Sequence, residues 1–148
     1  MTEVRASIDI AATPERVWAL AMDPECLRDW VTIHRALGPH DRGPVRRGYE
    51  MEQTLHLRGV NFKVHWELVS VTEGRHAEWH GRGPARSHAE TEYHLTAVDG
   101  GTRFAYRNVF KAPLGPIGAV ASRALVGGLP SREADATLHR LKALAERG

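Results

Sequence analysis

The sequence contains a single cysteine, Cys26, so no disulfide can form within the chain. A chain without disulfides suits a reducing compartment, and we therefore expect a cytoplasmic protein. No apolar run approaches the roughly 20 residues that a membrane-spanning helix needs, so we expect no integral membrane segment. The start of the chain carries an acidic residue and alternates in polarity, which is not typical of a secretory signal peptide.

Clusters of basic charge are also missing. The longest uninterrupted basic run is the pair Arg46-Arg47, and the formal net charge is only +2. The sequence pI of about 9.0 reflects a small excess of basic groups, most of which are arginines. Because a nucleic-acid-binding domain gathers basic residues on one face, we expect no nucleic-acid partner.

The chain lacks the short motifs of several enzyme classes. It has no nucleophile elbow, no zinc-protease motif and no glycine-rich phosphate loop. Cys26 has no catalytic signature around it and is interpreted as a small buried residue. Asp23 and Glu25 begin a predicted helix, where carboxylates are favourable near the positive end of the helix dipole. We therefore expect no cofactor, and the motifs leave open whether the protein is an enzyme.

What the chain does contain fits one globular domain. Its 42% hydrophobic and 26% charged residues are ordinary for such a domain, and no repeat or linker interrupts the sequence. We therefore expect a single domain over residues 1–148, which is long enough to bury a core and to enclose a ligand cavity.

The chain opens with a predicted strand and two short predicted helices. Residues 4–11 alternate between apolar and polar side chains, which indicates a half-buried strand. Thr13 followed by Pro14, and Asp23 followed by Pro24, are pairs of the kind that begin helices.

Six alternating segments follow, and a helix closes the chain. The segments predicted as strands are residues 30–37, 49–57, 61–69, 76–81, 87–97 and 102–110. Turn sequences separate them, so neighbours should pair as an antiparallel meander with one covered face and one wet face. Residues 113–148 are predicted to be helical with a division near Pro130, and an apolar stripe along residues 134–145 should cover the sheet.

Three segments carry a resemblance to a known superfamily: ASIDIAATPERVWALAMDPECLRDW (residues 6–30), GGTRFAYRNVF (100–110) and PLGPIGAVASRAL (113–125). In this order they resemble the START-related helix-grip superfamily (SRPBCC), in its polyketide cyclase/dehydrase-like group. The resemblance implies an α+β helix-grip fold, in which a curved antiparallel seven-stranded sheet wraps around a long C-terminal helix, with two short helices after the first strand. It also implies an apolar cavity between the sheet and that helix.

The resemblance implies the handling of a hydrophobic small molecule and leaves its use open. The leading hypothesis is the binding of a hydrophobic, ring-containing molecule, such as a lipid, a polyketide or a quinone-like compound. One alternative is a polyketide cyclase or aromatase acting on a poly-β-ketone, although no arginine–tyrosine or histidine–aspartate pair falls clearly on the inward face. Another is the toxin of a bacterial toxin–antitoxin pair, because WVTIH (residues 30–34) resembles a mycobacterial toxin subgroup with this fold. An antitoxin partner or a homodimer therefore stays open.

Polar residues on otherwise apolar strand faces are the candidates for ligand contact: Tyr49, Gln53, Thr91, Tyr93, Tyr106 and Asn108. A buried hydroxyl or amide without a partner costs about 1–3 kcal/mol, so each group needs a neighbour, a water or a ligand. Either these groups satisfy one another, or a few of them orient a ligand in an apolar pocket. Gln53 and Asn108 favour the second interpretation, because amides have little intrinsic preference for the middle of a strand.

Three tryptophans and one histidine complete the predicted site. Trp66 and Trp79 lie on one face of neighbouring predicted strands, either as core packing or as stacking surfaces for a flat ligand. Trp30 and His34 share a face of the segment 30–37, which in the resembled superfamily lies near the cavity mouth. His34 is the candidate general base because imidazole titrates near neutral pH. The alternative is a partly exposed polar residue at a strand end.

Residues 76–94 hold four of the nine histidines, interspersed with glutamates. Histidines two apart on a strand are compatible with a metal site, and the turn GRGPAR should bring His80 opposite His88. However, these histidines alternate with Trp79 and Tyr93, which places them on the outer face of the sheet. We therefore expect a solvated face and no metal site, with a pH-sensitive or dimer-forming surface as a lesser alternative.

Overall fold

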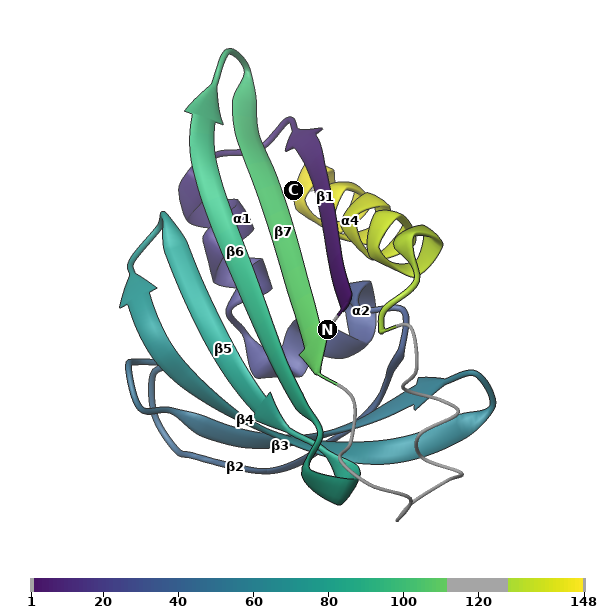
Figure 1. Cartoon of the computed structure of the whole chain (residues 1–148). Coiled ribbons are helices and arrows are strands. Elements are labelled where there is room, and N and C mark those ends of the chain that lie inside the picture. Colours follow the sequence, from purple (N-terminus) through teal and green to yellow (C-terminus); the bar gives the residue numbers. More distant parts are fainter. Residues whose placement is uncertain (1, 112–127, 148) are drawn as a thin grey trace.

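The structure, a computed structural model, describes residues 2–111 and 128–147. Its strands form one seven-stranded antiparallel sheet in the order β1-β7-β6-β5-β4-β3-β2 (Figure 1). The strands are β1 (Thr2–Ile10), β2 (His34–His40), β3 (Glu50–Leu57), β4 (Val60–Thr72), β5 (His76–Arg82), β6 (His88–Val98) and β7 (Gly101–Lys111). The first strand therefore pairs with the last strand, and the strands from β2 to β7 form the predicted meander.

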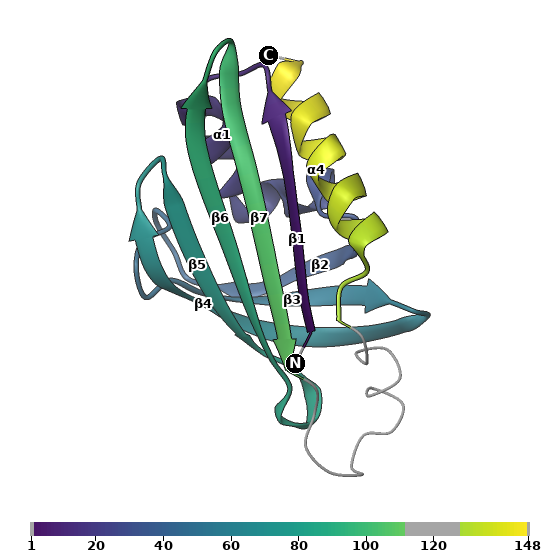
Figure 2. The same cartoon turned by 45° about the horizontal axis from the view of Figure 1, so that its top comes forward.

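Helices cover the concave side of this sheet. In the described residues these are α1 (Pro14–Ala21), η1 (Pro24–Cys26), α2 (Leu27–Trp30) and α4 (Ser131–Glu146), whereas the short η2 (Pro84–Arg86) lies in the turn between β5 and β6. Figures 1 and 2 show β2, β3 and β4 curving beneath the helices, while α4 runs beside β1. This is the predicted α+β helix-grip arrangement, which the structure confirms. No helix in the described part of the chain is long and apolar enough to cross a membrane.

The two short N-terminal helices begin at the predicted caps. The Thr13 hydroxyl accepts a hydrogen bond from the Arg16 amide at 3.3 Å, and Asp23 accepts one from the Glu25 amide at 3.0 Å. Pro14 and Pro24 each occupy the first helical position, where a missing amide hydrogen has no cost. These caps fix the direction in which the chain leaves β1.

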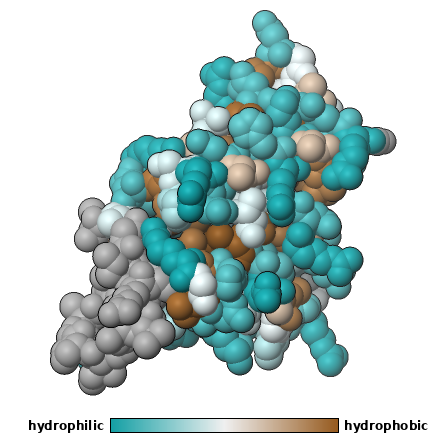
Figure 3. All heavy atoms as spheres, turned by 90° about the vertical axis from the view of Figure 1, so that its right-hand side faces the viewer, coloured by the Kyte–Doolittle hydropathy of each residue, from teal (hydrophilic) through white to brown (hydrophobic). Residues whose placement is uncertain are grey.

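The C-terminal helix α4 begins directly after Pro130, where a division was predicted. Residues 113–127 of the predicted helical segment lie outside the described residues. The helix buries one face, which consists of Ala134, Thr137, Leu138, Leu141 and Ala145. Figure 3 views the molecule from the side on which α4 lies. It shows hydrophobic residues gathered toward the middle of this side of the molecule and hydrophilic residues around them.

The prediction of a strand over residues 30–37 is wrong at its start. Trp30 ends α2, the Val31 amide donates to the Leu27 carbonyl, and β2 begins only at His34. The intervening Thr32 donates its amide hydrogen to the Thr137 hydroxyl on α4 at 3.1 Å. The alternating polarity around Thr32 therefore belongs to a turn that is hydrogen-bonded to α4 and not to a pleated strand.

The histidine-rich hairpin has the predicted faces but a different register. His80, His88 and His94 are exposed, which confirms that this face points outward. However, His80 lies opposite Glu90, and His88 lies opposite Arg82. The prediction that His80 faces His88 is therefore wrong, because η2 occupies the turn and sets β6 back by two residues.

Candidate ligand-binding site

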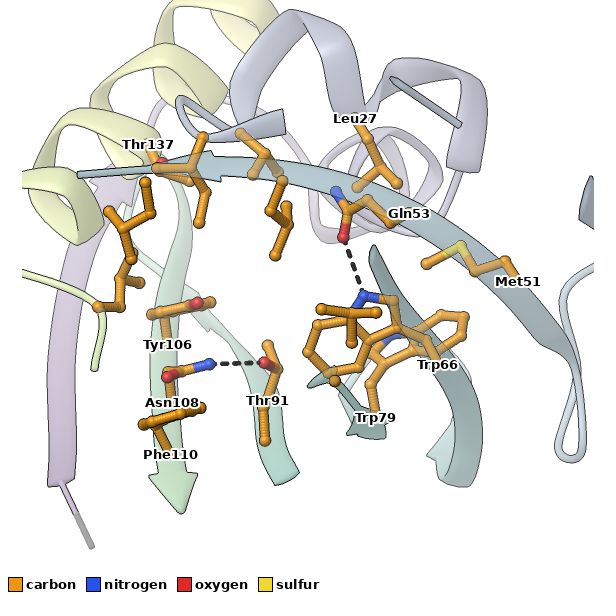
Figure 4. Close-up of a pocket in the computed structure, with 18 of the residues that line it drawn as sticks. Leu27, Met51, Gln53, Trp66, Trp79, Thr91, Tyr106, Asn108, Phe110 and Thr137 are labelled. Carbon is orange, nitrogen blue, oxygen red and sulfur yellow. Dashed lines mark hydrogen bonds between the residues drawn. The ribbon is translucent and has the colours of Figure 1, made fainter. Parts of the chain in front are cut away.

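A cavity of about 110 Å³ lies between the concave face of the sheet and the helices. A single water molecule needs roughly 10–15 Å³ of such cavity space, so the cavity holds several waters or a small ring system. Figure 4 shows side chains from β6 and β7 facing Gln53 and the two tryptophans of β4 and β5 across the open space. Most lining residues are apolar, including Met51, Leu55, Phe62, Val64 and Phe110.

Eight of the ten predicted site residues line this cavity: Trp30, Gln53, Trp66, Trp79, Thr91, Tyr93, Tyr106 and Asn108. Tyr49 does not line it but supports the cavity wall, because its ring meets Trp79 edge to face at 6.3 Å between centroids. The Tyr49 hydroxyl is 3.2 Å from Nδ1 of His40. His34 also lies outside the described lining, beside a separate surface hollow that Pro24 and Leu37 border.

Gln53 connects His34 to the cavity wall. Its side chain is 4% exposed, its Oε1 accepts a hydrogen bond from Nε1 of Trp66 at 2.9 Å, and its Nε2 is 2.8 Å from Nδ1 of His34. Because the indole can only donate, the amide nitrogen of Gln53 faces the imidazole, and Nδ1 of His34 must accept. Burial lowers the pKa of His34, which favours the same neutral imidazole.

A second polar group lies across the cavity on β6 and β7. Nδ2 of Asn108 donates to the Thr91 hydroxyl at 2.9 Å, and these residues are direct cross-strand partners. Tyr93 and Tyr106 form the next inward-facing pair, with stacked rings 6.1 Å apart. Burial raises the pKa of Tyr106 to about 12 and raises the pKa of Tyr93 as well. Both phenols are therefore protonated near neutral pH and can donate hydrogen bonds.

Aromatic contacts fix the inner wall behind these groups. Trp30 is fully buried and meets Tyr93 and Phe104 edge to face, with centroids 5.8 and 6.1 Å apart. Edge-to-face contacts of this kind add to the stability from buried area and hold each ring in one orientation. The wall is therefore a preformed surface rather than a set of mobile rings.

The helices contribute lining residues that the sequence did not identify. Met22, Leu27, Leu129 and Thr137 reach the cavity from the helix side, and His88 contributes from the start of β6. The sequence signal for Thr137 was its place beside the apolar stripe of α4, three residues after Ala134. His88 was expected only on the outer face, and it is exposed while it also borders the cavity.

The curved sheet, the covering helices and the apolar interior cavity define a helix-grip protein. The chain belongs to the polyketide cyclase/dehydrase and lipid transport family, whose model matches residues 1–146. The protein named toxin Rv0910 of Mycobacterium tuberculosis is 24% identical over 127 residues, which cover 84% of this chain and 88% of that protein.

Two solved structures are similar in fold across almost their entire length. Protein TTHA0849 from Thermus thermophilus has a TM-score of 0.77 and 22% identity, and the match covers 98% of this chain and 97% of that one. Protein DR_A0006 from Deinococcus radiodurans has a TM-score of 0.72 and 19% identity, and the match covers 100% and 99% of the two chains. At these identities the likeness shows the fold alone.

Proposed function

We propose that this protein, folded as one domain over residues 1–148, binds an apolar, ring-containing small molecule in its interior cavity. The observation that carries this proposal is the preformed cavity itself, whose apolar walls are interrupted by a few polar side chains. Sites of this composition bind small molecules by burying apolar surface and by orienting the ligand with few hydrogen bonds. The cytoplasmic location expected from the single cysteine stays a prediction.

The arrangement of the polar groups favours a flat ligand with an oxygen substituent. Trp66 and Trp79 offer ring surfaces on one side, while Tyr106 and Asn108 offer hydrogen-bonding groups on the other (Figure 4). A protonated phenol and an amide suit the carbonyl or hydroxyl groups of polyketide-like and quinone-like compounds. The family's description as lipid transport also supports a binding role.

The site supports binding better than proton transfer. A general base must lie within hydrogen-bond reach of the substrate, directly or through one water, and His34 stands behind Gln53. The tyrosines are protonated near neutral pH, so they cannot serve as bases there. His34 as a base remains the prediction of the cyclase alternative, and turnover of a poly-β-ketone that is unchanged in His34→Ala would contradict it.

The toxin alternative rests on the similarity to toxin Rv0910. If this chain acts in the same way, its expression alone should arrest growth, and co-expression of the neighbouring gene should restore growth. Normal growth at high expression would remove this alternative without affecting the binding proposal.

The binding proposal is tested with a neutral fluorescent ring compound, N-phenyl-1-naphthylamine, and with native mass spectrometry of the protein incubated with a quinone panel. We expect saturable binding of both kinds of compound, and we expect Asn108→Leu to weaken the binding of the quinones at least fivefold, because this substitution keeps the branched shape of the side chain but removes the amide. Glu90→Gln, a neighbour of Thr91 on the outer face of β6, is the matched control and should bind normally. Absence of saturable binding to every compound would contradict the proposal.

A further inference from the structure

The outer face of the β5–β6 hairpin holds a group of side chains that the cavity does not use. One imidazole nitrogen of His76, one of His94 and one carboxylate oxygen of Glu92 all lie within 4.8 Å of one another. His76 and Glu92 are half-buried, whereas His94 is exposed to solvent. The group is therefore both anchored in the sheet and open on one side.

The backbone explains why these three residues meet. His76 and His94 are direct cross-strand partners, and their ring centroids are 4.5 Å apart. Glu92 precedes His94 by two residues, so it points to the same face, and its Oε2 is 3.3 Å from Nε2 of His94. The observed register places His76 opposite His94 and so creates the cluster. The expected register, with His80 opposite His88, would not have paired these two histidines.

A cationic side chain lies next to Glu92: its direct cross-strand partner on β7 is Arg107. The Arg107 guanidinium lies 3.6 Å from Oε1 of Glu92, on the side away from the imidazole contact. Arg107 therefore orients the carboxylate so that Oε2 faces His94, as groups around a metal ligand commonly do.

Small neighbours leave room above the cluster. Thr72 on β4 is the partner of His76, and Ala105 on β7 is the partner of His94. Neither side chain is long enough to cover both imidazole rings.

We propose that His76, His94 and Glu92 form a binding site for a divalent transition cation of the zinc type. Two imidazoles and one carboxylate are a ligand set that Zn²⁺ accepts, with bonds of about 2.0–2.2 Å. Tetrahedral coordination at these lengths separates ligand atoms by about 3.3–3.5 Å, so a small adjustment of side-chain rotamers closes the site. The fourth position faces solvent and takes a water molecule. Ca²⁺ and Mg²⁺ prefer oxygen ligands and should bind poorly.

A cation at this position links β5 to β6 on the face opposite the ligand cavity. Because the site requires the folded hairpin, binding stabilises the folded protein by linkage. The sequence alone favoured a solvated face without metal, and the observed register is the new fact that changes this interpretation.

The test is a calorimetric titration of the full chain, without a histidine tag, with ZnCl₂. We expect one site per chain in the micromolar range, and at least tenfold weaker binding in His76→Ala, in His94→Ala and in Glu92→Gln. His65→Ala is the matched control, because His65 contacts Glu50 at 2.8 Å on the same outer face without a described third ligand. His80→Ala, which removes the partner of Glu78, is a second control. Both controls should bind within twofold of the unchanged protein.

Visible absorption of Co²⁺ added to the same proteins reports the coordination directly. Intense tetrahedral bands that disappear in His94→Ala would support the site, and circular dichroism without metal verifies that each variant is folded. Glu92→Gln keeps the shape of the side chain, so it remains informative if a histidine variant unfolds. The proposal is overturned if Zn²⁺ is not taken up, if uptake follows His65 or His80, or if Ca²⁺ binds equally well.

Discussion

At the scale of single residues, the polar groups of the cavity both bond to one another and face the space that a ligand would occupy. Gln53 is satisfied by Trp66 and His34, and Asn108 is satisfied by Thr91, as expected if buried polar groups bond to one another. Yet Gln53 and Asn108 also line open space (Figure 4). A side-chain amide has two donor and two acceptor positions, so Asn108 with one neighbour and Gln53 with two keep further hydrogen-bonding capacity for a ligand in a fixed direction.

Gln53 provides the sharpest prediction at this scale. Gln53→Leu keeps a similar volume but leaves Nε1 of Trp66 and Nδ1 of His34 without their partner. We expect the free energy of unfolding in urea to fall by about 1–3 kcal/mol, the cost of leaving a buried polar group unsatisfied. Thr54→Ala, on the opposite face of β3, should change it by less than about 0.5 kcal/mol. Equal stability of Gln53→Leu and the unchanged protein would show that this bridge contributes nothing.

At the scale of helices and strands, local signals were readable from the sequence and distant contacts were not. The caps at Thr13 and Asp23 act on amides two or three residues away, so a short segment contains all the information. By contrast, Thr32 contacts Thr137, which is 105 residues away, and this contact turns a predicted strand start into a turn. Alternation alone could not reveal it.

The same distinction separates the predictable part of the site from the rest. Alternation identified which strand residues face inward, and so placed Trp66, Thr91 and Asn108 correctly on the cavity wall. It did not reveal that Gln53 stands between His34 and the cavity. A two-residue alternation shows which face of a strand a side chain lies on, but it does not show which side chains lie nearer to the cavity. The register of the histidine hairpin was equally hidden, since it depends on the shape of η2.

One glycine tests how closely β4 and β5 fit together. Gly81 is the cross-strand partner of Trp66, and a Cβ atom built there would lie 2.8 Å from the indole and 2.7 Å from Val64. Gly81→Ala must therefore displace cavity-lining side chains, with an expected loss of about 1–3 kcal/mol in unfolding free energy and weaker probe binding.

Gly38→Ala is the control for this effect. Its new methyl carbon would lie 3.2 Å from Cβ of Glu52 on the two strands at one edge of the sheet, a looser contact than either of those at Gly81. We expect it to lower stability less than Gly81→Ala does and to leave binding unchanged, because Glu52 does not line the cavity. If Gly81→Ala behaved in the same way, the indole would have room to shift without cost.

At the scale of the molecule, both ends of the chain close the fold. β1 pairs with β7, and α4 packs on β1 (Figures 1 and 2). Hydrogen bonds join the end of α4 to the end of β1 and to the residue that follows it: Lys142 donates to the Asp9 carbonyl at 3.0 Å, and the Ala11 amide donates to Glu146 at 2.8 Å. Such contacts connect residues more than a hundred positions apart, so the cavity is complete only when the chain ends have docked.

A substitution of Arg16 tests how much the hydrogen bonds at the end of α4 contribute to stability. Its Nε donates to the Ala145 carbonyl at 2.7 Å, where the last carbonyls of α4 have no partner within the helix. We expect Arg16→Met to lower the free energy of unfolding by about 1–2 kcal/mol, because a charged donor is lost while the apolar stem is kept. Hydrogen exchange should accelerate in the last turn of α4 before it changes in the sheet. Arg140→Met, an exposed arginine on the same helix, should leave both measurements unchanged. If both variants have the same free energy of unfolding and the same hydrogen exchange, α4 is held by its apolar face alone, and the hydrogen bonds at its end add no stability.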